Sequence, residues 1–236
     1  MTQLRGKNIL VIGATGVLGS LLAQRLEAAG ANLILAGRNA DRLAALGVAG
    51  TAVVADLQNN AEAVIPAAIA ASETAGFGEH LDGVVLAAGV VAFGPAAELT
   101  PGTIDQLFAV NALGPITVIA AAIPALTASA AAGNEPFVLT MSGIVAESPT
   151  AGLAAYSASK AALAAFVAAT SREVRRPGIR LIDARPGHTE TGLVTRAIQG
   201  TAPAFPVGFA AEFVVDRMMT AITAGERDLP STAFSL

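Results

Sequence analysis

Short apolar runs alternate with longer, alanine-rich stretches along the whole chain. The short runs are rich in valine, leucine and isoleucine, and they lack the apolar–polar alternation of a half-exposed strand. Continuous apolar runs of this length are typical of parallel strands that are buried on both faces. The pattern predicts strands at residues 8–13, 32–37, 51–56, 81–89, 135–143 and 179–187.

The stretches between these strands keep leucine, isoleucine and valine at helical spacing, and local signals mark several helix ends. Gly30 closes the first helix, Asn39 can cap the second, and Thr100 precedes Pro101 at a first helical position. Residues 225–236 are expected to form at most a short last strand. The predicted helices span residues 17–30, 39–46, 59–75, 100–128, 152–176, 190–199 and 209–224.

Strands that alternate with helices predict an α/β fold with a doubly wound parallel sheet, in a three-layer αβα sandwich. The sequence contains no linker, no composition break and no internal repeat. We therefore expect residues 1–236 to form a single domain, long enough to bury a large core.

Composition narrows the classes of function. The net charge is −4, and Arg172, Arg175 and Arg176 read as the basic end of a helix, so nucleic-acid binding is not expected. The chain has no cysteine, which excludes disulfides and thiolate chemistry and is compatible with the cytoplasm. Its two histidines, His80 and His188, lie too far apart to suggest a metal site.

The mean hydropathy of +0.61 requires a test of the membrane alternative. Residues 116–133 carry no charge and are long enough to span a bilayer. However, this stretch consists mostly of alanine, with threonine, serine and Pro124 among them, and these residues contribute little to insertion. We expect a buried helix instead, and the N-terminus does not have the pattern of a signal peptide.

A glycine-rich loop, GATGVLG at residues 13–19, follows the first predicted strand and opens the first helix. Gly13 would allow the tight turn, Gly16 the approach of a pyrophosphate, and Gly19 close helix–strand packing. Free N–H groups at the helix start, including those near Thr15, Val17 and Leu18, would face the phosphates. An ordinary turn is the alternative, but the strand–loop–helix context favours dinucleotide binding.

The end of the second strand distinguishes the two nicotinamide cofactors. An NAD site usually has a carboxylate there, whereas this chain has Arg38, which can clamp a 2′-phosphate. The sequence therefore favours NADP(H), with a solvated loop arginine as the alternative. Asp56, beside Leu57 after the third strand, could contact the adenine edge or could cap a helix.

Tyr156, the only tyrosine, precedes Lys160 by one helical turn. A phenol with a pKa near 10 is a poor acid–base catalyst at neutral pH. An ammonium on the same helix face favours the phenolate and would lower that pKa. Taken alone, the pair could also be accidental.

The pair stands within a longer series of motifs: the glycine loop, Asp56, Ala87-Ala88-Gly89, Asn111, Ser142, Tyr156-x-x-x-Lys160 and Pro186-Gly187. In order and rough spacing this series resembles the short-chain dehydrogenase/reductase family over nearly the whole chain. The resemblance implies a Rossmann-type fold and hydride transfer with a nicotinamide cofactor.

The resemblance also implies roles for single residues. Tyr156 would be the general acid/base, Lys160 would lower its pKa and hold the nicotinamide ribose, and Ser142 would hydrogen-bond the substrate oxygen. Asn111 would anchor a water that links Lys160 to solvent. The cofactor would also contact Ala88, Gly89, Pro186, Gly187 and Thr189.

Three departures from the family pattern matter. The middle glycine of the loop lies one residue early for the commonest subgroup. The family's Asn-Asn-Ala-Gly is replaced by Leu86-Ala87-Ala88-Gly89. The family serine lies thirteen residues before the tyrosine, where this chain has Gly143, so we expect one extra residue in the loop 146–152 to bring Ser142 into place.

An NADP(H)-dependent oxidoreductase acting on a carbonyl/alcohol pair is the leading hypothesis. A non-catalytic dinucleotide-sensing regulatory protein is one alternative, although the tyrosine and the lysine are both present. A sugar-nucleotide epimerase or dehydratase is less favoured, because only about fifty residues follow Pro186. Residues 188–210 are expected to form a lid over a small or flat apolar carbonyl compound, in a homodimer or homotetramer.

Overall fold

A parallel sheet of six strands, in the order β3-β2-β1-β4-β5-β6, forms the centre of the computed structural model, which describes residues 2–235. The order reverses between β1 and β4, as in a doubly wound fold. The predicted fold class and all six predicted strands are therefore confirmed. The strands are β1 Asn8–Ile12, β2 Asn32–Gly37, β3 Thr51–Val54, β4 Gly83–Leu86, β5 Phe137–Met141 and β6 Arg180–Ala184.

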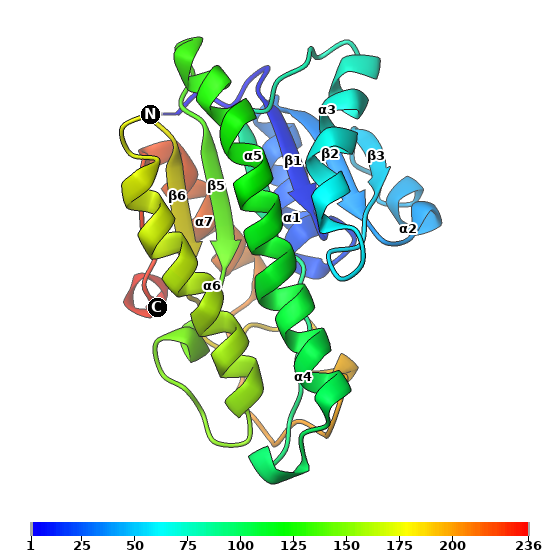
Figure 1. The fold of residues 1–236 in the computed structure, drawn as a ribbon, viewed down its shortest axis with the longest axis vertical. Helices are drawn as coiled ribbons and strands as arrows, with labels where there is room; N and C mark the ends of the chain where they lie inside the picture. Colours follow the sequence, from blue (N-terminus) through cyan, green and yellow to red (C-terminus); the bar gives the residue numbers. More distant parts are fainter. Residues whose placement is uncertain (1, 236) are drawn as a thin grey trace.

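Helices cover both faces of the sheet, as Figure 1 shows: α3, α5 and α6 lie on one face and α1 and α7 on the other. The α-helices are α1 Val17–Ala28, α2 Ala40–Ala44, α3 Val64–Thr74, α4 Pro101–Phe108, α5 Gly114–Ala131, α6 Ala154–Glu173 and α7 Ala211–Ala224. Short 3-10 turns are η1 Ala61–Ala63, η2 Ala96–Glu98, η4 Ile144–Ala146, η5 Val194–Arg196 and η6 Ser231–Phe234. A π-helical turn, η3 Ala109–Leu113, joins α4 to α5.

The strands are apolar on both sides because each side meets a helical layer. Along β1, Leu10 and Ile12 pack into the core under α3, α5 and α6, whereas Ile9 and Val11 pack under α1 and α7. Burial of each such side chain contributes about 1.5–3 kcal/mol. This two-sided burial explains why the strand sequences read as unbroken apolar runs.

The predicted helix over residues 100–128 begins as expected and then changes its winding. Thr100 caps α4 by accepting a hydrogen bond from the backbone N–H of Thr103, with Pro101 at the first position. The π-helical turn η3 follows at once. Pro115 has no N–H to offer the Asn111 carbonyl, which removes one α-helical hydrogen bond at this point.

The α4–α5 region, Pro101–Ala131, is long and apolar enough to cross a membrane by length and composition, but half of its most apolar window is buried inside the molecule. Val118, Ile119, Ala122 and Leu126 of α5 pack into the core against the sheet. The stretch is therefore built as a core helix, as the alanine-rich sequence predicts.

The helix predicted at residues 190–199 is wrong, because only the three-residue turn η5 forms there. Gly192 adopts φ +65°, a left-handed conformation that ends helical winding. At the C-terminus Leu229 makes one isolated bridge to Ala184 before Pro230, which has no N–H to extend a ladder.

Candidate active site

A cleft of about 570 Å³ runs along the carboxyl ends of the strands, on both sides of the point where the strand order reverses. Ligands of doubly wound sheets bind at this position. Loops that follow all six strands contribute to its wall. Of the predicted site residues, only Gly19 and Asn111 do not line the cleft itself.

The glycine loop leaves room at one end of the cleft for a ligand backbone. Gly13 has φ +82°, and a Cβ there would lie 2.6 Å from the backbone nitrogen of Ala88. A Cβ on Gly19 would lie 2.2 Å from the Gly13 carbonyl oxygen, so α1 packs directly on the turn. Gly16 caps α1 without a side chain, and the N–H groups of Val17 and Leu18 in the first turn have no intrahelical partner.

This arrangement fits the diphosphate of a dinucleotide, because unpaired N–H groups and the positive end of a helix face an unobstructed part of the cleft. Any side chain at Gly13 or Gly19 would collide with backbone. The residues at this end of the cleft therefore meet the steric and electrostatic requirements of the cofactor that the sequence predicts.

Two arginines stand at the end of β2. Arg38 is exposed at the cleft wall, as predicted, and Arg42 joins it from α2. The predicted cap is present: Asn39 accepts a hydrogen bond from the backbone of Arg42 at 2.8 Å. The Arg42 guanidinium donates to the Thr15 carbonyl at 2.9 Å, which holds it over the glycine loop. The spacing R-x-x-x-R around a capping asparagine could have identified this second cation.

Asp56 lies in the cleft wall and its carboxylate already has local partners. One oxygen accepts from the backbone of Gln58 at 3.0 Å and the other from the side chain of Asn59 at 2.7 Å. These bonds close a turn at residues 57–59; Asp56 does not cap a helix, because the next helical turn, η1, has Asn60 at its N-cap position. The turn does not prevent contact with an adenine, since Asp56 and Leu57 both line the cleft.

Tyr156 and Lys160 lie in the first two turns of α6 and both face the cleft. The lysine Nζ lies 5.9 Å from the centroid of the tyrosine ring and donates to the Met141 carbonyl at 2.7 Å. The tyrosine ring packs in a small apolar cluster around Val91, Phe93 and Leu153.

Burial dominates the titration of both groups. It raises the pKa of Tyr156 to about 12. It lowers the pKa of Lys160 to about 8, against the opposing effect of the Asp183 charge. The expected lowering of the phenol pKa by Lys160 is thus not seen in this structure, because desolvation of the phenolate outweighs the nearby ammonium.

Asn111 projects from the π-helical turn and joins three segments. Its side-chain oxygen accepts from the Val90 backbone at 3.0 Å, and its nitrogen donates to the Val90 carbonyl at 2.9 Å and to Ser159 Oγ at 3.1 Å. A Cβ on Gly89 would lie 3.3 Å from Asn111 Oδ1 and 3.6 Å from Lys160 Nζ. Asn111 and Lys160 therefore approach the same glycine, although Asn111 itself is behind the cleft wall.

Ser142 lines the cleft, but its hydroxyl is hydrogen-bonded inside the protein. Its side chain is fully buried, and Oγ donates to Asp183 Oδ2 at 2.5 Å. The contact with a substrate oxygen that the family resemblance implies is not available from this orientation. Gly143 follows with φ +75° and adds no side chain to the wall. A polar residue inside the apolar strand sequence IRLIDA was the signal that could have identified Asp183 as the partner of Ser142.

The loop after β6 forms another part of the cleft wall. Pro186, Gly187 and Thr189 line the cleft as predicted. His188 stacks on Phe205 with ring centroids 5.0 Å apart, which brings residues from both ends of the expected lid together. Phe205, which lines the cleft, is 36% exposed, and Val207, outside the lining, is 94% exposed, so this segment presents apolar side chains to solvent.

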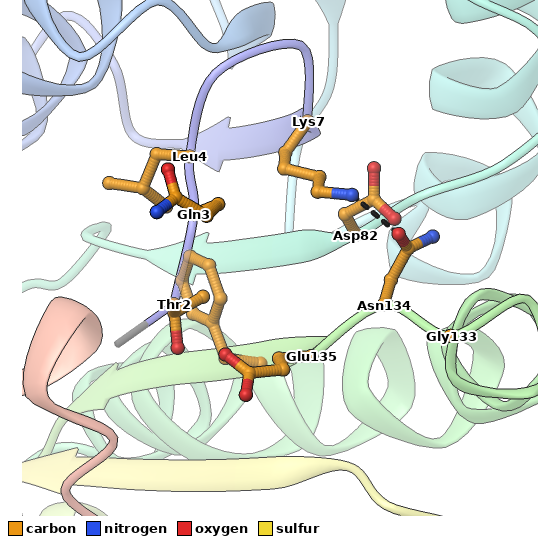
Figure 2. Close-up of a pocket in the computed structure, with 9 residues that line it drawn as sticks. Thr2, Gln3, Leu4, Lys7, Asp82, Gly133, Asn134 and Glu135 are labelled. Carbon is orange, nitrogen blue, oxygen red and sulfur yellow. Dashed lines mark hydrogen bonds between the residues drawn. The ribbon is translucent and has the colours of Figure 1, made fainter.

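A second, smaller cavity of about 360 Å³ lies at the opposite, amino-terminal edge of the sheet (Figure 2). Lys7 and Asn134 meet across it in a hydrogen bond. Asp82 beside them is buried and is already bonded to the backbone of Asn8 and to Ser129. The polar groups of Lys7, Asn134 and Asp82 in this cavity therefore already have protein partners.

The fold and the large cleft together define a dinucleotide-dependent oxidoreductase class, and comparison with known proteins agrees. The sequence model of the short chain dehydrogenase family matches residues 7–201. The chain therefore belongs to the short-chain dehydrogenase/reductase family. It is an NAD(P)-dependent dehydrogenase/reductase with a nicotinamide dinucleotide cofactor and a small-molecule substrate.

Characterised and uncharacterised relatives extend over most of the chain. An uncharacterized oxidoreductase of Staphylococcus epidermidis is 26% identical over 229 residues and covers 94% of both chains. An uncharacterized oxidoreductase of Mycobacterium tuberculosis is 32% identical over 76% of this chain and 66% of its own. The cyclic-di-GMP-binding biofilm dispersal mediator protein of Escherichia coli is 29% identical over 81% of this chain and 76% of its own.

Solved structures share the fold. A short chain dehydrogenase from Burkholderia cenocepacia in complex with NADP has a TM-score of 0.80 at 24% identity, and covers 97% of this chain and 89% of its own. The 3-ketoacyl-(acyl-carrier-protein) reductase from Brucella melitensis, complexed with NADH, has a TM-score of 0.82 at 24% identity, and covers 98% of this chain and all of its own. Both nicotinamide cofactors thus occur on this fold.

Proposed function

We propose that this protein is an NADP(H)-dependent oxidoreductase that interconverts a carbonyl and an alcohol, with Tyr156 as the general acid/base. The observation that carries the proposal is the placement of Tyr156 and Lys160 in one cleft with the glycine loop. A cofactor bound along that loop would supply or accept the hydride. The chain's own residues would orient the substrate oxygen, exclude water and move one proton.

Tyr156 would exchange that proton with the substrate oxygen. Its surroundings are apolar, so the neutral phenol is the stable form and is suited to donate a hydrogen bond to a carbonyl. Lys160, held by the Met141 carbonyl, would bind the ribose and stabilise the phenolate. Asn111 lies near Lys160 beside Gly89, and it would anchor the predicted water that links Lys160 to solvent.

The preference for NADP(H) would come from Arg38 and Arg42. The two guanidiniums stand at the cleft wall after β2. Arg42 is steadied by Thr15, and a 2′-phosphate between the two cations would gain charge-assisted hydrogen bonds. The described part of this wall has no carboxylate directly after β2 to receive free ribose hydroxyls.

The substrate would be an apolar carbonyl compound. The wall near Tyr156 includes Val91, Phe93 and Leu153, and Phe205 closes the mouth from the segment 188–210 that we propose as a lid. A flat or small apolar molecule matches this lining. We further propose that the protein is cytoplasmic and forms a homodimer or homotetramer, consistent with the apolar helix surfaces of α4, α5 and α6.

The lone tyrosine gives a direct test, because the protein also has no tryptophan. Near-ultraviolet absorbance during a pH titration reports Tyr156 alone, and the midpoint is expected at about 12 without cofactor. Saturating NADP⁺ brings a positive ring beside the phenol and should lower the midpoint. NADPH oxidation with a panel of apolar ketones should then be lost in Tyr156→Phe. A midpoint that does not respond to NADP⁺, together with no turnover, would favour the sensing alternative.

A further inference from the structure

The buried carboxylate of Asp183 accepts hydrogen bonds from residues at the end of β5, near the proposed active site. Asp183 lies at the carboxyl end of β6 and is 3% exposed. Its Oδ1 accepts from Thr140 Oγ1 at 2.7 Å and from the Ser142 backbone at 3.3 Å. Its Oδ2 accepts from Ser142 Oγ at 2.5 Å and from Arg185 Nη1 at 3.0 Å. The carboxylate is thus bonded to both residues that flank Met141.

Met141 carries the carbonyl that holds Lys160. The lysine Nζ donates to this oxygen at 2.7 Å. Side chains alternate along a strand, so Thr140 and Ser142 point to the same side and Met141 points to the other. Met141 also pairs with Ala184 in the β5–β6 register, next to Asp183. The position of the lysine's acceptor therefore depends on the segment that Asp183 fixes.

We propose that Asp183 is a positioning residue for Lys160: it fixes the Met141 carbonyl that receives the lysine Nζ, and its buried charge balances the ammonium. This inference rests on the proposed function of Lys160 as the partner of Tyr156. It also explains why the hydroxyl of Ser142 is bonded inside the protein. Ser142 serves as a donor to Asp183 rather than to a substrate.

The cation next to Asp183 does not cancel the effect of the Asp183 charge on the pKa of Lys160. Arg185 is the cation bonded to Asp183, but its Nε also donates to Glu147 and its Nη2 donates to both oxygens of Asp228 at 2.8 Å. Three carboxylates therefore share one guanidinium. Lys160 is faced by Tyr156 on its own helix and by Asp183 from β6, and Asn111 of η3 is neutral. Asp183 accordingly acts in favour of the charged lysine, against burial.

The chain contains only two lysines, Lys7 and Lys160, which makes the lysine titration directly observable. Lysine labelled with ¹³C at Cε gives two resonances, and Lys7→Arg assigns them. We expect the Lys160 resonance to titrate near pH 8 in the unsubstituted protein. In Asp183→Asn its midpoint should fall by about one pH unit. Asp228→Asn is the matched control, since it removes another Arg185 partner that is 59% exposed, and should leave the midpoint in place.

Activity supplies a second readout. With the Lys160 midpoint lowered by about one pH unit, kcat of Asp183→Asn should be about fivefold lower than that of the unsubstituted protein at pH 8, and nearly equal at pH 6. A uniform structural defect would lower kcat equally at both pH values. A Lys160 midpoint and a pH profile that are the same in folded Asp183→Asn and in the unsubstituted protein would overturn the proposal.

Thr140→Val provides the fallback if Asp183→Asn does not fold. It keeps the charge and the volume but removes one of the two side chains, on either side of Met141, that are bonded to Asp183. The Lys160 Cε resonance at pH 7 should shift, and an unchanged resonance would count against the positioning role. The lysine spectrum needs neither substrate nor cofactor, so it tests Asp183 even if no turnover is found. If Tyr156→Phe abolishes turnover while Asp183→Asn changes nothing, only the role of Asp183 is refuted.

Discussion

Lys160 should lower the free energy of unfolding of the protein, although we propose that it is needed for activity. We predict that Lys160→Met abolishes turnover and yet makes the protein more stable at neutral pH. The lysine is 7% exposed, and burial lowers its pKa to about 8. An unfolded chain has a lysine pKa of about 10.4. Because the folded pKa lies below the unfolded one, folding at neutral pH must bury a charge that the unfolded chain keeps in water.

The gap between these two pKa values corresponds to roughly 3 kcal/mol at pH 7. Methionine removes this penalty and fills a similar volume. It also removes the hydrogen bond to the Met141 carbonyl, which offsets about 1 kcal/mol. We therefore expect Lys160→Met to raise the free energy of unfolding by roughly 2 kcal/mol at pH 7.

The pH dependence identifies the cause. The destabilisation by Lys160 is fully present below pH 8 and is lost as the pH rises towards about 10.4, so the advantage of methionine should nearly vanish by about pH 9.5. Urea unfolding at both pH values, followed by circular dichroism, measures this. Lys7→Met, at the opposite edge of the sheet, is the control and should bring no such gain. A Lys160→Met protein that is equally or less stable at pH 7 would refute the reasoning.

Three further variants test the rest of the site. Tyr156→Phe should keep the melting temperature but lower kcat by a factor of at least about 100, and a smaller loss in steady-state assays would contradict its role as acid/base. Replacing both Arg38 and Arg42 by alanine should weaken NADP⁺ binding by about 10- to 100-fold and leave NAD⁺ binding unchanged, as measured by calorimetry. Equal losses of affinity for both cofactors would contradict a 2′-phosphate clamp. Gly13→Ala should lower stability by at least about 2 kcal/mol, whereas Gly102→Ala, in open space on α4, should raise it slightly in the same urea melts; similar values for the two would contradict the steric role of Gly13.

Much of this architecture could be predicted from the sequence, because it depends on short-range patterns. Unbroken apolar runs predicted the strands, and glycine spacing marked the end of the cleft where we propose that the cofactor phosphates bind. Tyr156 and Lys160 one turn apart marked the helix that we propose as catalytic. Each of these signals is written within a few consecutive residues, so no knowledge of distant contacts was needed.

The remaining features depend on contacts between distant segments. The orientation of Ser142 is set by Asp183, which lies on another strand. The raised pKa of Tyr156 reflects an apolar cluster assembled from several loops. The helix predicted at 190–199 does not form, because Gly192 adopts a left-handed conformation that ends helical winding. Spacing along the sequence alone cannot specify a rotamer, a desolvated phenol or such an interruption.

The π-helical turn at Ala109–Leu113 behaves as one residue inserted into an otherwise α-helical rod. Each residue of an α-helix advances the chain by about 100° of rotation, so removal of one residue here would restore regular winding and rotate everything before it relative to α5. Asn111 would then lose its hydrogen bonds to Val90 and Ser159, whereas α5 would stay packed against the sheet. A single-codon deletion at Leu113, between Asn111 and α5, would thus leave a folded chain that has lost the link between the loop after β4 and α6. Evolution could therefore remove the support that Asn111 gives to the proposed active site by deleting one residue, while the core around α5 stays intact.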